Sequence, residues 1–213
     1  MKIAIGQIGT DADKTANFAL VAQAVITAAM NHARLILFPE ATMRAFGTGR
    51  LDEIAEPLDG PFVSALAGLA KNYNIAIVVG MFRPADQHVV SGRTINRVYN
   101  TTVAICPDGT VVHYDKIHTY DAFGYRESDT IKPGKNLVTF TYNTVTFGLA
   151  TCYDLRFPQQ FRQLARRGAD IILVPTSWAD GPGKLQQRQL LIRARALDAT
   201  SWVIAADQTH HAT

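Results

Sequence analysis

Short apolar runs alternate with longer amphipathic segments along most of the chain. The short runs are rich in Ile, Val and Leu, as buried strands are, whereas the longer segments repeat their apolar residues at helical spacing. Such alternation predicts an α/β architecture. We expect strands at Ile3–Ile8, Arg34–Phe38, Ile75–Phe82, Val145–Cys152, Ile171–Val174 and Trp202–Asp207. We expect helices at Thr15–His32, Pro61–Tyr73, Pro158–Arg167 and Leu185–Ala199.

The order strand–helix–strand–helix–strand occurs twice along the chain. The segment Ala33–Glu40 can be laid beside Ala169–Thr176, because each follows a helix, continues as an apolar run and ends in a proline and one further residue. This favours an internal βαβαβ duplication that forms two similar sheets, packed through the faces that carry no helices. The alternative is the periodicity that α/β chains often show without any duplication.

A hairpin distinguishes the first half from the second. Val98–Cys106 and Thr110–Asp115 flank Pro107–Gly109, whose glycine suits a left-handed turn position. No counterpart follows the strand Trp202–Asp207, because the sequence stops soon after it. We therefore expect residues 1–213 to be a single domain that lacks its C-terminal strands, as a fragment or a natural truncation.

Composition narrows the classes of function. The chain has 213 residues, of which 47% are hydrophobic, enough for one sizeable core. A net charge of +3 without a run of five like charges does not favour nucleic acid, and the apolar runs fall short of the ~20 residues of a membrane span. Two cysteines make no disulfide framework, and no secretory signal pattern opens the sequence, so we expect a cytoplasmic protein.

Cys152 is the best candidate for a nucleophile. It ends a predicted strand, the polar Tyr153 and Asp154 follow, and Pro158 opens a helix. Open α/β sheets place their chemistry at such strand ends, and backbone N–H groups at the turn could form part of an oxyanion hole. A lone cysteine is, however, more often inert core.

Glu40 and Lys116 are the candidates that could activate the thiol. Glu40 ends an apolar strand, where partial burial should raise its pKa toward the range of a general base; the alternative is a solvated strand-end glutamate. Lys116 ends the hairpin and could reach into a cleft, although a surface lysine is the commoner case. His113 and His118 flank Lys116, but neither belongs to a credible zinc set.

Four segments together resemble the signatures of one family. Phe38–Glu40, Lys116–His118 and Cys152–Pro158 bring Glu, Lys and Cys in that order, and Tyr125–Asp129 is similar to the segment that carries a second glutamate. They resemble the nitrilase superfamily of carbon–nitrogen hydrolases over nearly the whole chain. The most similar branch is that of the amidases, which includes omega-amidase and deaminated glutathione amidase. This resemblance implies a four-layer αββα sandwich and a homodimer.

The resemblance also implies a mechanism and roles. A small-molecule amide is hydrolysed through a thioester on Cys152, with Glu40 as the base and with Lys116 and the Tyr153 N–H stabilising the oxyanion. Glu127 holds Lys116 and helps to position the substrate. Neither a metal nor an organic cofactor is required.

The substrate and two alternative functions stay open. Arg156 is a candidate clamp for a substrate carboxylate, or else it pairs with Asp154 inside the protein. The other candidate pocket residues are His118, Phe123, Tyr125 and Trp178. One alternative is a non-catalytic, truncated family member, and another is an N-acyltransferase that uses the same thioester.

Overall fold

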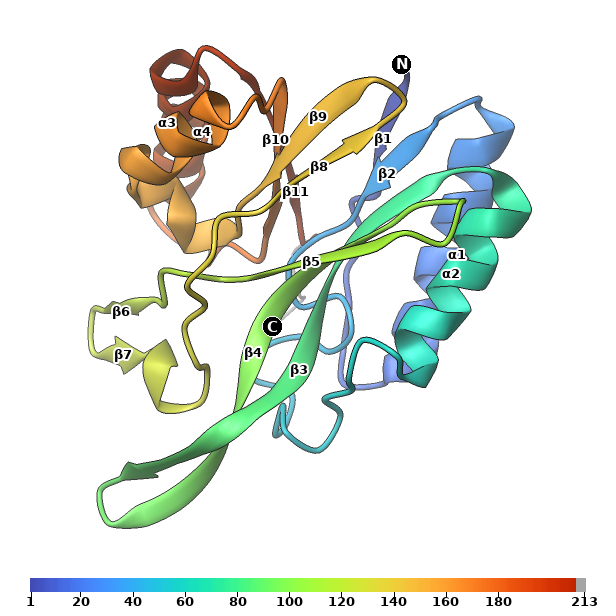
Figure 1. The fold of residues 1–213 in the computed structure, drawn as a ribbon. Coiled ribbons are helices and arrows are strands. Elements are labelled where there is room, and N and C mark those ends of the chain that lie inside the picture. Colours follow the sequence, from blue (N-terminus) through green and yellow to red (C-terminus); the bar gives the residue numbers. More distant parts are fainter. Residues whose placement is uncertain (210–213) are drawn as a thin grey trace.

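A computed structural model, which describes residues 1–209, is a four-layer αββα sandwich (Figure 1). Two β-sheets lie at its centre, α1 and α2 cover one of them, and α3 and α4 cover the other. The predicted fold class is therefore confirmed. The helices are α1 Lys14–Met30, α2 Pro61–Tyr73, α3 Pro158–Arg166 and α4 Lys184–Ala199. None of the described helices is both long and apolar enough to cross a membrane.

The first sheet has five strands in the order β1-β2-β3-β4-β5, and the second has four in the order β11-β10-β9-β8. The first comprises β1 Ile3–Ile5, β2 Leu35–Leu37, β3 Ala76–Val90, β4 Arg93–Ile105 and β5 Val111–Asp115. The second comprises β8 Thr139–Tyr142, β9 Val145–Leu149, β10 Ile171–Thr176 and β11 Trp202–Asp207. A small hairpin, β6 Asp121–Ala122 and β7 Tyr125–Arg126, precedes the 3₁₀ turn η1 Glu127–Asp129, and a second 3₁₀ turn is η2 Cys152–Arg156.

The topology confirms the internal duplication. Strands β1, β2 and β3 are adjacent and parallel, with α1 and α2 as crossovers, and β9, β10 and β11 repeat this arrangement with α3 and α4. The additions differ: the hairpin β4–β5 continues from β3, whereas β8 joins the other edge of its sheet, beside β9.

The two sheets pack through their helix-free faces, as predicted. Leu35, Leu37 and Val78 of the first sheet share one buried apolar cluster with Phe147 and Leu173 of the second. Each such buried side chain stabilises the fold by about 1.5–3 kcal/mol. Since the sheets are held face to face, the carboxyl ends of β2, β9 and β10 converge at one end of the molecule.

Several strand predictions needed correction. Strand β1, predicted over Ile3–Ile8, ends at Ile5. Strand β9 ends at Leu149, so Cys152 opens a 3₁₀ turn rather than ending a strand. Strands β3 and β4 are longer than predicted and project as a two-stranded arm (Figure 1). Strand β8 was not predicted. The arm and β8 lack the continuous apolar run that marks the buried strands, because polar residues interrupt the apolar ones in both.

Candidate active site

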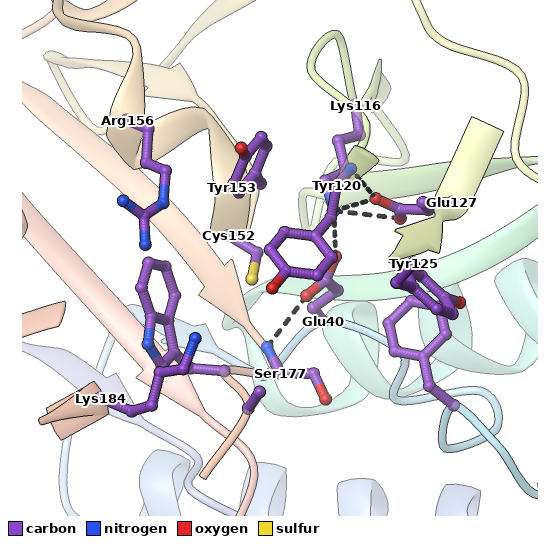
Figure 2. A pocket seen from close by; sticks show the side chains of 13 residues that line it. Glu40, Lys116, Tyr120, Tyr125, Glu127, Cys152, Tyr153, Arg156, Ser177 and Lys184 are labelled. Atoms are coloured by element: carbon purple, nitrogen blue, oxygen red, sulfur yellow. Dashed lines mark hydrogen bonds and ion pairs between the residues drawn. The ribbon is translucent and has the colours of Figure 1, made fainter. Parts of the chain in front are cut away.

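Side chains from the ends of several strands face one cavity of about 270 Å³ (Figure 2). Cys152 follows β9, Glu40 follows β2, and Lys116 follows β5. All four predicted catalytic side chains line this cavity, since Glu127 of η1 does so too. The sequence prediction thus named residues that the fold brings together.

The turn that carries Cys152 is built by a capping box. The Thr151 side chain accepts a hydrogen bond from the Asp154 N–H, and the Asp154 carboxylate accepts one from the Thr151 N–H at 2.8 Å. Within this turn Cys152 has a φ of +45°, the left-handed region that non-glycine residues rarely occupy. Such backbone strain concentrates at functional sites, where the surrounding structure enforces it.

Asp154 anchors this turn from inside the protein. Its fully buried carboxylate accepts hydrogen bonds from the Tyr114 hydroxyl at 2.6 Å and the His118 N–H at 3.1 Å, and the His118 Nδ1 lies at 2.7 Å. The His118 ring stacks on Phe157, with centroids 3.6 Å apart. His118 therefore supports the turn that carries Cys152 through its contacts with Asp154.

Glu40 is fixed by close backbone packing within its own half and by hydrogen bonds to the other half. A Cβ at Gly80 would lie 2.8 Å from the Ala41 N and 2.9 Å from the Glu40 Cα, so this crossing requires glycine. The Glu40 N–H donates to the Thr176 carbonyl at 3.3 Å, and the Ser177 N–H donates to Glu40 Oε2 at 2.9 Å. Glu40 is thereby held by hydrogen bonds both at its backbone N–H and at its side-chain carboxylate.

Lys116 is held between two buried carboxylates. Its Nζ lies 3.0 Å from Glu40 Oε1 and 3.0 Å from Glu127 Oε2, and each of the three side chains is at most 4% exposed. The Tyr120 N–H donates to Glu127 at 2.6 Å. Asn100, which sequence reasoning missed, donates from Nδ2 to Glu40 Oε1 at 2.7 Å.

Burial and neighbouring charges set the pKa values of the cluster. Burial raises the pKa of Glu40, against the opposing effect of Lys116. Burial alone would lower the pKa of Lys116, but Glu127 and Glu40 outweigh it and hold that pKa well above its ordinary value. Burial, and next Glu40, raise the pKa of Cys152 well above that of a free thiol. The resting thiol thus keeps its proton until a base removes it.

The outer part of the cavity combines aromatic rings with two cations. Arg156, Tyr125 and Trp178 line it as predicted, and so does Tyr153. The Arg156 guanidinium lies 5.6 Å from the Tyr153 ring and 5.7 Å from the Trp178 ring, as cation–π pairs do. Its ion pair with Asp154, the alternative from the sequence, is not formed. The lining residues that the sequence prediction missed are Phe46, Tyr120, Ser177, Ala179 and Lys184.

Two predicted substrate residues lie elsewhere. The His118 side chain makes the contacts to Asp154 described above and does not line the cavity. Phe123 has a φ of +54° and is 85% exposed, and Lys184 Nζ lies 5.2 Å from its ring. Within residues 1–209, no group of three His, Cys, Asp or Glu side chains is arranged to hold a metal ion.

Comparisons with known proteins agree with this architecture. A sequence model described as carbon-nitrogen hydrolase matches residues 2–212. A protein of Mycobacterium tuberculosis named only as a hydrolase is 44% identical over 98% of this chain and 72% of its own length. A deaminated glutathione amidase of Escherichia coli O157:H7 is 31% identical, over 98% of this chain and 78% of its own.

A solved structure shares the fold. An amidase from Nesterenkonia sp. superposes with a TM-score of 0.82 at 25% identity, covering 98% of this chain and 76% of its own. In a glutamate-to-glutamine variant of the Nesterenkonia sp. AN1 amidase, acrylamide has added to the active-site cysteine. The protein described above belongs to the carbon-nitrogen hydrolase family of the nitrilase superfamily.

Proposed function

We propose that this protein hydrolyses small-molecule amides to a carboxylic acid and ammonia through a thioester on Cys152. One observation carries the proposal: a thiol, a carboxylate and an ammonium group, from segments that follow three different strands, are buried together in a single cavity. The amidases among its relatives support an amide as the substrate. The small volume of the cavity favours a small acyl group.

In the acylation step, Glu40 takes the proton of the Cys152 thiol as the sulfur attacks the amide carbon. A carbon–sulfur bond forms, and the carbonyl electrons move onto the oxygen. The Lys116 ammonium and the Tyr153 N–H stabilise this oxyanion, and one such donor contributes about 3–4 kcal/mol. As the second residue of η2, Tyr153 has no acceptor for its N–H within the turn. The carbon–nitrogen bond then breaks, and the protonated Glu40 gives its proton to the leaving ammonia.

In the deacylation step, Glu40 takes a proton from water as the water oxygen attacks the thioester carbon. The carbon–sulfur bond breaks, the sulfur regains the proton from Glu40, and the carboxylic acid leaves. The balance is one amide and one water converted to one acid and one ammonia. Glu127 keeps Lys116 charged and oriented through both steps, since it contacts the Nζ with both of its oxygens.

The outer cavity favours an acyl group that ends in an anion such as a carboxylate. Arg156 and Lys184 both line this part of the cavity. The hydrogen bond of the Arg156 guanidinium to Gln187 Oε1 is 3.3 Å long, and the flanking rings are uncharged. The cation is thus available to a charged substrate group. Arg156→Ala should raise the KM for carboxylate-bearing amides about tenfold and leave the KM for neutral amides unchanged.

A panel of small amides, with ammonia release as the measurement, tests the proposed function. The protein should release ammonia from at least one amide, and Cys152→Ala should lower the rate by about a thousandfold or more. Cys106→Ala is the matched control and should keep full activity. A folded protein that releases no ammonia from any amide would contradict the proposal and favour a non-catalytic role. A product that forms only when an amine acceptor is added would favour acyl transfer.

We also propose a cytoplasmic location and a homodimer. Both cysteines are free thiols, which supports a reducing compartment. The homodimer follows from the family resemblance alone. Light scattering coupled to gel filtration gives the mass in solution, and a monomeric mass would contradict the dimer.

A further inference from the structure

Asn100 is a buried residue that forms hydrogen bonds with all three residues of the charged cluster, Glu40, Lys116 and Glu127. It lies in β4 and is 1% exposed. Its Nδ2 is 2.7 Å from Glu40 Oε1 and 3.4 Å from Glu127 Oε1, and its backbone carbonyl accepts the Lys116 N–H at 2.9 Å. The side chain therefore bridges the two carboxylates, while the backbone holds the lysine between them.

The other end of this amide has no partner. Asn100 Oδ1 is buried and accepts no hydrogen bond from any residue of the described chain. A buried carbonyl without a donor costs free energy, and an apolar side chain of the same shape would avoid that cost. Only the NH₂ end can face two carboxylates, because the oxygen would be repelled by both. The residue is thus explained by its two N–H donors rather than by stability.

The charge balance of the cluster explains why the N–H donors of Asn100 are needed. With both carboxylates ionised and Lys116 protonated, the buried group carries one excess negative charge. The other titratable side chains that face Glu40 are the Cys152 thiol and the Tyr125 phenol, and neither is cationic. Burial and Glu127 both raise the pKa of Glu40, whereas hydrogen bonds such as that from Asn100 lower it. A neutral donor stabilises the carboxylate without adding a charge that would need its own partner.

We propose that Asn100 is a positioning residue of the hydrolytic site, whose bridging amide keeps Glu40 ionised and directed at the Cys152 thiol. This inference rests on the proposed role of Glu40 as the base. In addition to Glu40, Lys116 and Cys152, the site then requires a neutral hydrogen-bond donor that is shared between Glu40 and Glu127.

The pH profile of kcat/KM for amide hydrolysis tests this role in the whole protein. Asn100→Leu has a similar shape but no donor, so the pKa of Glu40 should rise. The acidic limb should then move up by about one pH unit, which is a tenfold loss of kcat/KM below the limb. Asn100→Ala should move the limb in the same direction, in case the leucine does not fit. Asn96→Leu, an exposed position on the same strand, is the matched control and should keep the profile of the parent.

The outcomes separate the inference from the function on which it rests. An equal loss at every pH, or an unmoved limb in folded Asn100 variants, overturns the positioning role. The rate at which iodoacetamide alkylates Cys152 gives a second readout that needs no amide turnover, because Glu40 must take the same proton. If no amide is hydrolysed and the alkylation limb still moves in Asn100→Leu, the proposed function fails and the role of Asn100 stands. Hydrolysis and alkylation with unshifted limbs overturn the role of Asn100 alone.

Discussion

The two βαβαβ units share one frame, yet they place different chemistry at matching strand ends. The segment after β2 presents the Glu40 carboxylate, whereas the segment after β10 presents the backbone N–H of Ser177. These matching ends meet, since the Ser177 N–H donates to Glu40 and the Glu40 N–H donates to the Thr176 carbonyl. Duplication thus places equivalent strand ends opposite each other, so that one half can supply a reactive group and the other its support.

The first strands of the two units differ in the same way. The chain leaves β1 through Gly6, where a Cβ would lie 2.6 Å from the Phe38 ring, so this end is filled by packing. After β9 the chain enters the capping box, in which Cys152 has a positive φ and lines the cavity. The first half adds Asn100 and Lys116 on the hairpin β4–β5. Glu40 and Lys116 therefore come from one half and the thiol from the other.

Replacing the carboxylate of the first half should have the largest effect. Glu40→Gln keeps the shape of the side chain but cannot take a proton, so kcat should fall by about 10²–10⁴-fold. Steady-state kinetics on the best amide of the panel measures this loss. Glu53→Gln, at an exposed glutamate, is the control and should keep its activity. A loss of less than threefold in kcat for Glu40→Gln would contradict the assignment of the reactive carboxylate to the segment after β2.

A pair of glycines, one in each sheet, tests whether close packing at a glycine serves the site or the core. Gly80→Ala on β3 pushes a methyl group into the backbone at Glu40, so kcat/KM should fall about ten- to a hundredfold. Gly148→Ala on β9 meets side chains of Leu164 and Ala169 at 3.2–3.3 Å, so it should cost about 1–3 kcal/mol of unfolding free energy. Its kcat/KM should stay within about threefold of the parent. Denaturant unfolding and kinetics on both variants make the comparison, and equal activity losses would contradict it.

The frame and the candidate reactive groups could be predicted from the sequence, because local residue patterns indicate both. Apolar runs mark the strands, and Glu40, Lys116 and Cys152 stand directly after such runs or one short turn beyond. Asn100 could not be recognised, because its role depends on contacts with Glu127 and Glu40, which are remote in sequence. Asn100 also does not stand out within β4, which carries other polar residues such as Asn96, Thr101 and Thr102.

The misplaced residues teach the same lesson. His118 stands two positions after Lys116, and strand alternation would put both on one side, but β5 ends at Asp115 and the chain then turns. The His118 side chain therefore contacts Asp154 instead of lining the cavity. No local sequence pattern indicated that Asp154 is fully buried. Phe123 lies at the tip of the hairpin β6–β7, where its φ is positive and its ring is exposed. The spacing of two residues in the sequence predicts whether they share the site only while both belong to the same strand or helix.

The two cysteines offer the smallest expected effect and the most direct comparison of the halves. Burial raises the pKa of Cys106 to about 11, so at pH 8 roughly one molecule in a thousand carries its thiolate. Cys152 is also buried, but it lines the cavity beside Glu40, which can take its proton. Iodoacetamide at pH 8 should therefore alkylate Cys152 and leave Cys106 unmodified, as peptide mass spectrometry can show. Labelling of Cys106 should rise about tenfold for each pH unit below 11, because only the thiolate reacts. Equal labelling of both thiols at pH 8 would mean that Glu40 gives Cys152 no advantage.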